Sequence, residues 1–151
     1  MTFKEIIDDL AKESGLPLEL DNNESCMLES DDIVITVQHR NVQDDVVIFA
    51  PVTDPDKIAR LNESVLRSAL SLSYNGVGTG GCYIGLYEES LVLTKYISAQ
   101  NLTSEILAMQ INDFSRIAAD VRDTILNAYQ DIPAVEISDG GVDNYAMGLS
   151  V

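Results

Sequence analysis

The sequence predicts an α+β fold, with a single-layer antiparallel sheet and helices in the order αβββαββα. The first observation behind this prediction is that the spacing of apolar residues changes along the chain between the helical period of 3.6 and the strand period of 2. The second is the length of 151 residues with 46% hydrophobic residues, which suits one globular domain with a buried core. No internal repeat or low-complexity block indicates another architecture.

The first helix is expected over residues 3–14. Thr2 and Glu5 have the spacing of a capping box, in which each side chain accepts a hydrogen bond from the backbone N–H of the other residue. Gly15 ends the helix and Pro17 follows just beyond it, as is usual at a helix C-terminus. The apolar residues recur at helical spacing and are Phe3, Ile6, Ile7 and Leu10.

Three short strands are expected between residues 18 and 50, where the apolar residues change to strand spacing. Turn-forming residues at 21–23 and 30–32, and a polar link at 41–45, separate them. The apolar positions are Leu18, Leu20, Cys26–Leu28, Ile33, Ile35, Val37 and Val46–Ala50.

A second helix is expected over residues 55–73. Asp54 supplies an N-cap, and Pro55 takes the first helical position, where its missing N–H leaves no intrahelical bond unmade. The apolar residues occupy more than one side of this helix and are Ile58, Leu61, Val65, Leu66, Ala69 and Leu70. Because so wide an apolar arc indicates two burial partners, we expect the helix to face its own sheet and a second subunit.

A strand hairpin and a last helix are expected in the C-terminal part. Residues 82–87 and 91–97 have the pattern of two strands around a turn at 88–90. Thr103 opens a helix that runs to about residue 128. The apolar face of this helix consists of Leu107, Ile111, Phe114, Ala118, Val121 and Ile125.

The final segment differs in composition from the rest of the chain. From residue 130 onward it holds four acidic residues, three glycines and no Lys or Arg. We therefore predict a folded domain over residues 1–129 and a flexible acidic tail over residues 130–151.

The charge balance is strongly acidic and limits the class of partner. Nine Lys and Arg against twenty-five Asp and Glu leave a net charge of −16, with a pI near 4.1. This field repels phosphate backbones and anionic lipids, so the sequence argues against nucleic-acid binding and membrane insertion. Partners are expected to be neutral, basic or apolar.

The sequence also indicates a cytoplasmic protein. The N-terminus has acidic residues where a signal peptide would be apolar, and no stretch approaches the ~20 apolar residues of a membrane span. Cys26 and Cys82 are too few for a disulfide framework and lack metal-ligand spacing. We expect two reduced thiols buried in strands.

Gly76, Gly78 and Gly81 have the G-x-G-x-x-G spacing that approaches a pyrophosphate in dinucleotide-binding proteins. Phosphate binding by that motif needs a strand before the glycines and a helix after them. Here the order is reversed, because the expected second helix precedes the glycines and a strand follows. We therefore expect a helix-to-strand turn with close backbone packing.

Other motifs with known chemistry are incomplete. Residues 21–32 can be aligned with an EF-hand loop, but Cys26 stands where that loop needs glycine and Asp32 where it needs glutamate. His39, the single histidine, ends a strand with no nucleophile near it in sequence, and we expect it at the surface. The sequence predicts no catalytic residue, no metal site and no cofactor, which leaves a binding protein.

Three apolar patterns, taken with the acidic composition and the element order, resemble a known family. They are Leu16–Leu20 followed by Cys26–Leu28, the leucine-rich second helix, and Gly80–Leu86 leading into Leu91–Leu93. The chain resembles a class I type III secretion chaperone of the Tir-chaperone (CesT-like) family over about residues 3–128. The acidic tail departs from a minimal member of that family.

The resemblance implies a homodimer whose two-fold interface is built by the second helix and the strand after it. The corresponding residues here are Leu61, Val65, Leu66, Ala69, Tyr83 and Ile84. It also implies a cytoplasmic chaperone that holds the N-terminal segment of a secreted effector in extended form. Such a chaperone keeps its effector secretion-competent, delivers it to the export ATPase, and consumes no nucleotide itself.

An extended peptide can add a strand at a sheet edge while its apolar side chains enter pockets. The candidate effector-binding residues lie in the first helix and the first three strands and are Phe3, Ile6, Ile7, Leu10, Leu18, Leu20, Ile35, Val37, Val47 and Phe49. Alternation alone does not say which of them face the effector and which face the core. Two alternatives remain: an acidic dimeric adaptor or regulatory domain of the same fold that binds a folded partner, and an enzyme that uses the Gly-rich loop.

Overall fold

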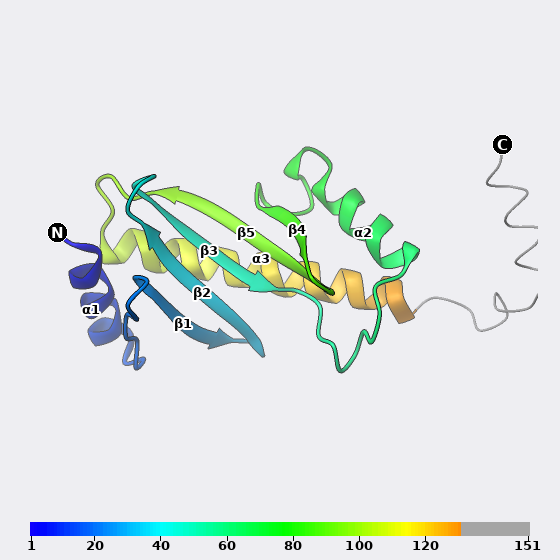
Figure 1. Ribbon diagram of the computed structural model, residues 1–151, viewed down its shortest axis with the longest axis horizontal. Coiled ribbons are helices and arrows are strands. Elements are labelled where there is room, and N and C mark those ends of the chain that lie inside the picture. The colour runs from blue at the N-terminus through cyan, green and yellow to red at the C-terminus, as the bar shows by residue number, and fades with distance from the viewer. Residues whose placement is uncertain (131–151) are drawn as a thin grey trace, which may run out of the picture.

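The computed structural model describes residues 1–130, and the predicted tail from residue 131 onward lies outside the described residues. The described part contains three α-helices, one 3₁₀ turn and a five-stranded sheet (Figure 1). In chain order the elements are α1 (Phe3–Ser14), β1 (Ser25–Ser30), β2 (Ile33–Arg40), β3 (Asp45–Pro51), α2 (Glu63–Ser73), η1 (Tyr74–Gly76), β4 (Tyr83–Tyr87), β5 (Ser90–Ser98) and α3 (Ser104–Gln130). The α+β class and the order αβββαββα are confirmed.

The sheet has the strand order β1-β2-β3-β5-β4, and every neighbouring pair is antiparallel. β1 and β4 are therefore its two edges, with α1 near the β1 edge and α2 near the β4 edge (Figure 1). The β1–β2 hairpin closes through Asp31 and Asp32, whose φ angles of 55° and 63° lie in the left-handed region. This conformation is that of a two-residue type I′ turn, whose twist matches that of the strands.

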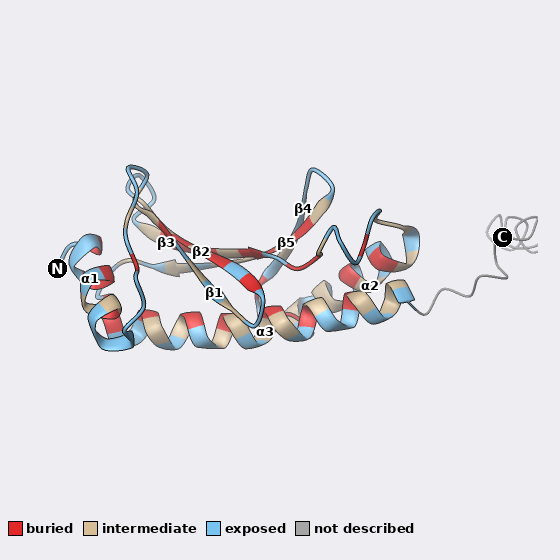
Figure 2. Ribbon diagram, turned by 90° about the horizontal axis from the view of Figure 1, so that it is seen from below, coloured by how far each residue is buried: buried red, intermediate tan, exposed pale blue. Residues whose placement is uncertain are grey.

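Helix α3 lies along one face of the sheet and encloses the core (Figure 2). All six residues of its predicted apolar face are buried, and they pack on strand residues such as Ile35, Ile48 and Leu93 in one continuous cluster. A 27-residue helix is about 40 Å long at 1.5 Å per residue, so α3 spans the whole width of the sheet. No helix of the described chain covers the opposite face (Figure 2).

The capping signals predicted for α1 are present. The Thr2 hydroxyl accepts a hydrogen bond from the Glu5 N–H at 3.2 Å, and the Glu5 carboxylate accepts one from the Thr2 N–H at 3.3 Å. Gly15 ends the helix with φ +73°, and its N–H donates to the Ala11 carbonyl at 2.9 Å. The predicted apolar residues of this helix are all buried.

Two predicted boundaries were wrong. The second helix begins at Glu63, because Asp54 caps only one turn: its carboxylate accepts from the Asp56 N–H and its carbonyl from the Ile58 N–H. The chain then leaves that turn, and the Asn62 side chain caps α2 by accepting from the Val65 N–H at 2.9 Å. A second boundary error concerns Leu18 and Leu20, which lie in the connection between α1 and β1 and in no strand.

Candidate functional site

Most of the predicted effector-binding residues are covered in the described structure. Eight of the ten side chains are buried: Phe3, Ile6, Ile7, Leu10, Leu18, Ile35, Val37 and Val47. Leu20 and Phe49 are half-buried. Because these side chains are buried, a partner that binds near α1 and β1 would contact the residues around them. These residues include the free edge of β1.

The backbone of β1 has unpaired groups on its outer side. The Glu24 carbonyl accepts a hydrogen bond from the His39 N–H at 3.0 Å, so Glu24 and the alternate residues after it face β2. The backbone groups of the residues between them, Ser25, Met27 and Glu29, face outward. Ser25 is hydrogen-bonded to Asp21 in the turn before the strand. Within residues 1–130, the N–H and C=O groups of Met27 and Glu29 therefore remain available to a further strand.

Side chains near the β1 edge combine a few apolar groups with carboxylates. Met27 is 67% exposed and Leu16 is 45% exposed, while Leu20 and Leu28 are half-buried against the core. The exposed acidic residues of the strand and its turn are Glu29, Asp31 and Asp32. This edge therefore suits an extended peptide that offers backbone hydrogen bonds, occasional apolar side chains and basic residues.

The predicted dimer residues divide between the core and the surface. Val65 and Ala69 are buried in the chain's own core, and Leu61 and Ile84 are half-buried. Leu66 and Tyr83 are exposed, as an interface with a second molecule requires. The exposed apolar residues of this end, here called the α2/β4 surface, are Leu66, Leu70, Tyr74, Val77, Tyr83, Leu86 and Tyr87.

The α2/β4 surface also contains exposed apolar residues that are not in the predicted interface set. Leu70 is 73% exposed and Tyr74 is 73% exposed, and both follow Leu66 at intervals of four residues on one side of the helix. This four-residue spacing in the sequence indicates a stripe of apolar residues on one side of the helix. The predicted interface set therefore combines Val65 and Ala69, which are buried, with Leu66, which is exposed.

The Gly-rich segment is an ordered turn packed on two helices. A Cβ on Gly78 would lie 2.9 Å from the Leu72 carbonyl oxygen, and one on Gly80 would lie 2.5 Å from the end of the Ile117 side chain. The buried Thr79 hydroxyl donates to the Cys82 carbonyl at 2.8 Å and closes the turn. Strand β4 follows it, so the turn has no helix N-terminus that would bind phosphate.

His39 is less exposed than predicted. Its ring stacks on that of Phe3 with centroids 5.2 Å apart, and only 13% of its side chain is exposed. Nδ1 lies 3.4 Å from a Glu24 carboxylate oxygen and Nε2 lies 3.5 Å from one of Asp44. The expectation of a surface residue was wrong because α1 covers this end of β2, and the contact ties the helix to the sheet.

The remaining side chains that could take part in chemistry have structural roles. Cys26 and Cys82 are free and buried. Burial is the main cause that raises the pKa of the Cys26 thiol to about 11, and it also raises the pKa of Cys82. Across residues 1–130, no three His, Cys, Asp or Glu side chains gather in a way that could hold a metal ion. Among the described helices, none is both long and apolar enough to cross a membrane.

The fold, the free strand edge and the α2/β4 surface define a small acidic binding protein of the α+β class. Its sequence matches the model of the Tir chaperone protein (CesT) family over residues 5–122, and the chain belongs to this family. No curated protein matches the chain.

Solved structures share the fold at low sequence identity. The HopA1–SchA chaperone–effector complex matches with 18% identity and a TM-score of 0.61, over 80% of this chain and 93% of the other. The Yersinia pestis type III secretion chaperone SycH, in complex with a fragment of YscM2, matches with 17% identity and a TM-score of 0.59, over 80% and 99%. YbjN from E. coli matches with 15% identity and a TM-score of 0.52, over 85% and 95%.

Proposed function

We propose that the protein is a cytoplasmic type III secretion chaperone that binds the N-terminal segment of a secreted effector in extended form and keeps it secretion-competent. The observation that carries the proposal is the family match over residues 5–122. The similar folds of a chaperone–effector complex and of a type III secretion chaperone with a bound fragment support it. In this proposal the protein acts by binding and catalyses no reaction.

The β1 edge is the proposed docking site for the effector. A strand added there would pair with the outward N–H and C=O groups of Met27 and Glu29, and backbone pairing supplies affinity without requiring one fixed sequence. The exposed Met27 side chain and the half-buried Leu20 and Leu28 offer apolar contacts beside that strand. The net charge of −16 would speed association with a basic segment, and added salt would slow it.

The α2/β4 surface is the proposed two-fold interface of a homodimer. A self-complementary apolar patch is the commonest way in which identical chains associate, because one patch covers both copies. Leu66, Leu70 and Tyr74 lie on one side of the α2–η1 segment, and α2 contacts β4. The exposed apolar side chains of β4 alternate between the two faces of the sheet, with Leu86 on one face and Tyr83 and Tyr87 on the other. The dimer places a β1 edge at each end, so that one extended effector segment contacts both subunits. The export ATPase is the proposed recipient of the loaded complex.

The proposal is tested by copurification. The full chain is expressed with the N-terminal 100 or so residues of the effector encoded beside its gene, a length that extended wrapping of a disordered segment needs. The expected complex contains two copies of this chain and one effector segment, measured by multi-angle light scattering. A monomer that retains no effector segment would contradict both parts of the proposal.

A matched pair of variants tests the β1 edge separately. Met27→Pro removes one outward N–H, which an edge strand tolerates because that group does not pair with β2. Met27→Ala shortens the same side chain and keeps the N–H. We expect the proline variant to lose at least about tenfold in effector affinity, which corresponds to one lost hydrogen bond, and the alanine variant to lose less. Equal affinities for the two variants would place the effector elsewhere.

The second candidate is an acidic dimeric adaptor or regulatory domain that binds a folded partner. The similar fold of YbjN favours keeping it, since that protein's fold occurs outside the named secretion chaperones. Genes for effectors or for the secretion apparatus beside this gene would favour the chaperone. Capture of a folded partner with no extended segment would favour the adaptor.

A further inference from the structure

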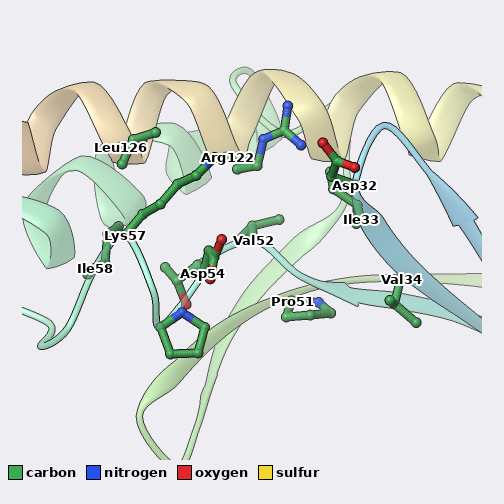
Figure 3. Close-up of a pocket in the computed structure, with 12 residues that line it drawn as sticks. Asp32, Ile33, Val34, Pro51, Val52, Asp54, Lys57, Ile58, Arg122 and Leu126 are labelled. Atoms are coloured by element: carbon green, nitrogen blue, oxygen red, sulfur yellow. The ribbon is translucent and has the colours of Figure 1, made fainter.

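Besides the β1 edge, two more features of residues 1–130 are open to a partner, a pocket and the outer edge of β4. The pocket has a volume of about 250 Å³ and lies between the start of β2, the loop from β3 to α2, and α3 (Figure 3). Its two cations, Lys57 and Arg122, are matched in number by Asp32 and Asp54, so its charge selects no ligand. The edge of β4 is more specific, because its backbone and its sequence both restrict what can pair with it.

The backbone of β4 has unpaired groups on its outer side. Tyr87 and Ser90 are partners across a two-residue turn, and the pair that closes such a turn is a hydrogen-bonded pair. Because hydrogen bonding alternates along an antiparallel strand, every second residue of β4, counted back from Tyr87, bonds to β5. The backbone groups of the two residues between them, Ile84 and Leu86, therefore point away from β5.

The residue opposite Leu86 supports this assignment. Leu91 directs both of its backbone groups away from β4, since its N–H donates to the Thr53 hydroxyl at 3.0 Å and its carbonyl accepts from the Val52 N–H at 2.8 Å. In the part of the chain that the structure describes, the N–H and C=O groups of Ile84 and Leu86 have no other backbone partner. They are available to a further strand.

The sequence of β4 is nearly the same in both directions, because Tyr83–Tyr87 reads YIGLY. When two copies of this strand pair antiparallel about Gly85, each tyrosine lies opposite a tyrosine and Ile84 lies opposite Leu86. Both aliphatic residues have outward backbone groups, so each Ile84–Leu86 pair exchanges two hydrogen bonds. A register shifted by two residues in either direction would pair only one of the two aliphatic residues in this way.

Gly85, at the centre of this pairing, is not explained by the chain's own fold. Its φ angle is not positive, and nothing lies within 4 Å of its Cβ position. A glycine inside a strand costs stability and often marks a place where another backbone approaches closely. In the pairing described, the two Gly85 residues form a non-hydrogen-bonded pair, in which the Cα atoms are about 4.5 Å apart.

The side chains of β4 suit the same arrangement. Tyr83 and Tyr87 are exposed on the uncovered face of the sheet, where the Tyr83 ring already lies edge-on to Tyr96 with centroids 6.1 Å apart. Aromatic pairs at opposite positions of neighbouring strands are stabilising. Leu86 is exposed on the other face, on the side where α2 packs against α3 (Figure 2).

We propose that β4 pairs antiparallel with β4 of a second copy of this chain, with the two-fold axis at Gly85, so that the two sheets join into one. The inference rests on the proposed homodimer and adds the strand pairing and its register. A second copy is favoured over a strand of another protein, because a two-fold contact needs a self-complementary strand and YIGLY is one. Joining the edges also removes the exposed β4 edge, which would otherwise pair with other chains.

The register is tested by cysteine crosslinking in the full chain. Gly85→Cys should form a disulfide between two copies under oxidised glutathione, because about 4.5 Å between Cα atoms suits a disulfide. Tyr83→Cys and Tyr87→Cys should each crosslink several-fold less alone, whereas an equimolar mixture of the two should crosslink well, since these positions are opposite each other. The unchanged chain is the control, because Cys26 and Cys82 are buried.

A pair of variants tests the hydrogen bonds. Leu86→Pro removes an outward N–H, which an edge strand tolerates, and Leu86→Ala shortens the same side chain and keeps the N–H. We expect the proline variant to raise the dimer dissociation constant at least about tenfold more than the alanine variant. Light scattering against protein concentration measures this. Equal effects of the two variants would overturn the strand pairing.

The outcomes separate this inference from the proposed function. A chain that is dimeric by light scattering, but in which Gly85→Cys does not crosslink or Tyr83→Cys crosslinks alone, would overturn the register and leave the proposed homodimer in place. A monomer would overturn both. Effector binding is measured separately by copurification, so its failure would not affect the result for β4.

Discussion

The two edges of the sheet differ in what surrounds them. At the β4 end, the seven large apolar side chains of the α2/β4 surface are exposed. At the β1 edge the exposed apolar residues are Met27 and Leu16, and the rest of the edge offers unpaired backbone and carboxylates. A broad apolar patch needs a permanent apolar cover, whereas a polar strand edge can stay in water until a peptide arrives. The proposed function therefore assigns a permanent and a transient interface to a single sheet.

The largest expected effect separates the two sides of α2. Val65→Asp puts a charge in the chain's own core, where Val65 is fully buried. Because that charge has no partner, we expect a loss of at least about 4 kcal/mol in unfolding free energy, measured by urea denaturation. A soluble, folded Val65→Asp variant that has merely lost its partner chain would mean that Val65 belongs to the interface and not to the core.

The matched variant on the outward side is Leu70→Asp. Leu70 is 73% exposed, so we expect the fold to remain and the dimer to weaken by about a hundredfold, as for a charge buried at a contact worth about 3 kcal/mol. Light scattering against protein concentration measures this. An unchanged dimer would show that the α2/β4 surface is not the dimer interface. Only the proposal for the β1 edge would then remain.

The sequence predicted the helices and strands better than it predicted which of their faces are buried. Both ends of α1 were predictable, because the capping box at Thr2 and the left-handed Gly15 each depend only on residues within one helical turn. The start of α2 was misplaced because Asp54-Pro55 and Asn62 are both good caps. In the structure Asp54 caps a single turn and Asn62 caps α2, and the sequence pattern does not rank the two caps.

The candidate surfaces were only partly predictable for a related reason. Both faces of the sheet carry apolar residues, so alternation could not tell the covered Ile35 from the exposed Val34 beside it. The outward groups of Met27 follow from the position of β1 at the edge, and strand order was not part of the sequence prediction. Two burial partners were expected for the second helix, but the spacing did not show that Leu66 and Leu70 face outward while Val65 and Ala69 face the core.

A smaller effect tests whether the turn before β4 supports the α2/β4 surface. Gly80 has φ +57°, and its Cβ position meets Ile117 of α3. Gly80→Ala should cost about 1–2 kcal/mol of unfolding free energy, the strain of a left-handed residue with a side chain. Gly85→Ala is the control, because nothing lies within 4 Å of its Cβ position. Equal stabilities of the two variants would show that the turn is not constrained.

The last effect concerns the buried thiol of Cys26 on the β1 edge strand and is confined to alkaline pH. The pKa of Cys26 is raised from 9.0 to about 11, so its folded state resists ionisation that the unfolded state allows. Its contribution to stability is therefore kept below pH 9 and lost as pH rises from about 9 to about 11. Urea unfolding at several alkaline pH values should show this decline, and Cys26→Ala should reduce it. A decline of the same size in the variant would assign it to other groups.

The proposed roles of the two edges are tested by amide hydrogen exchange in the full chain, with and without the effector segment. We predict that the amides of Met27 and Glu29 exchange quickly in the free protein and become protected when the segment binds. We also predict that the amides of β4 are equally protected in both states, because in the proposed dimer a second copy already covers that end. Protection of β4 on binding, with Met27 and Glu29 unchanged, would contradict the assignment of the two edges.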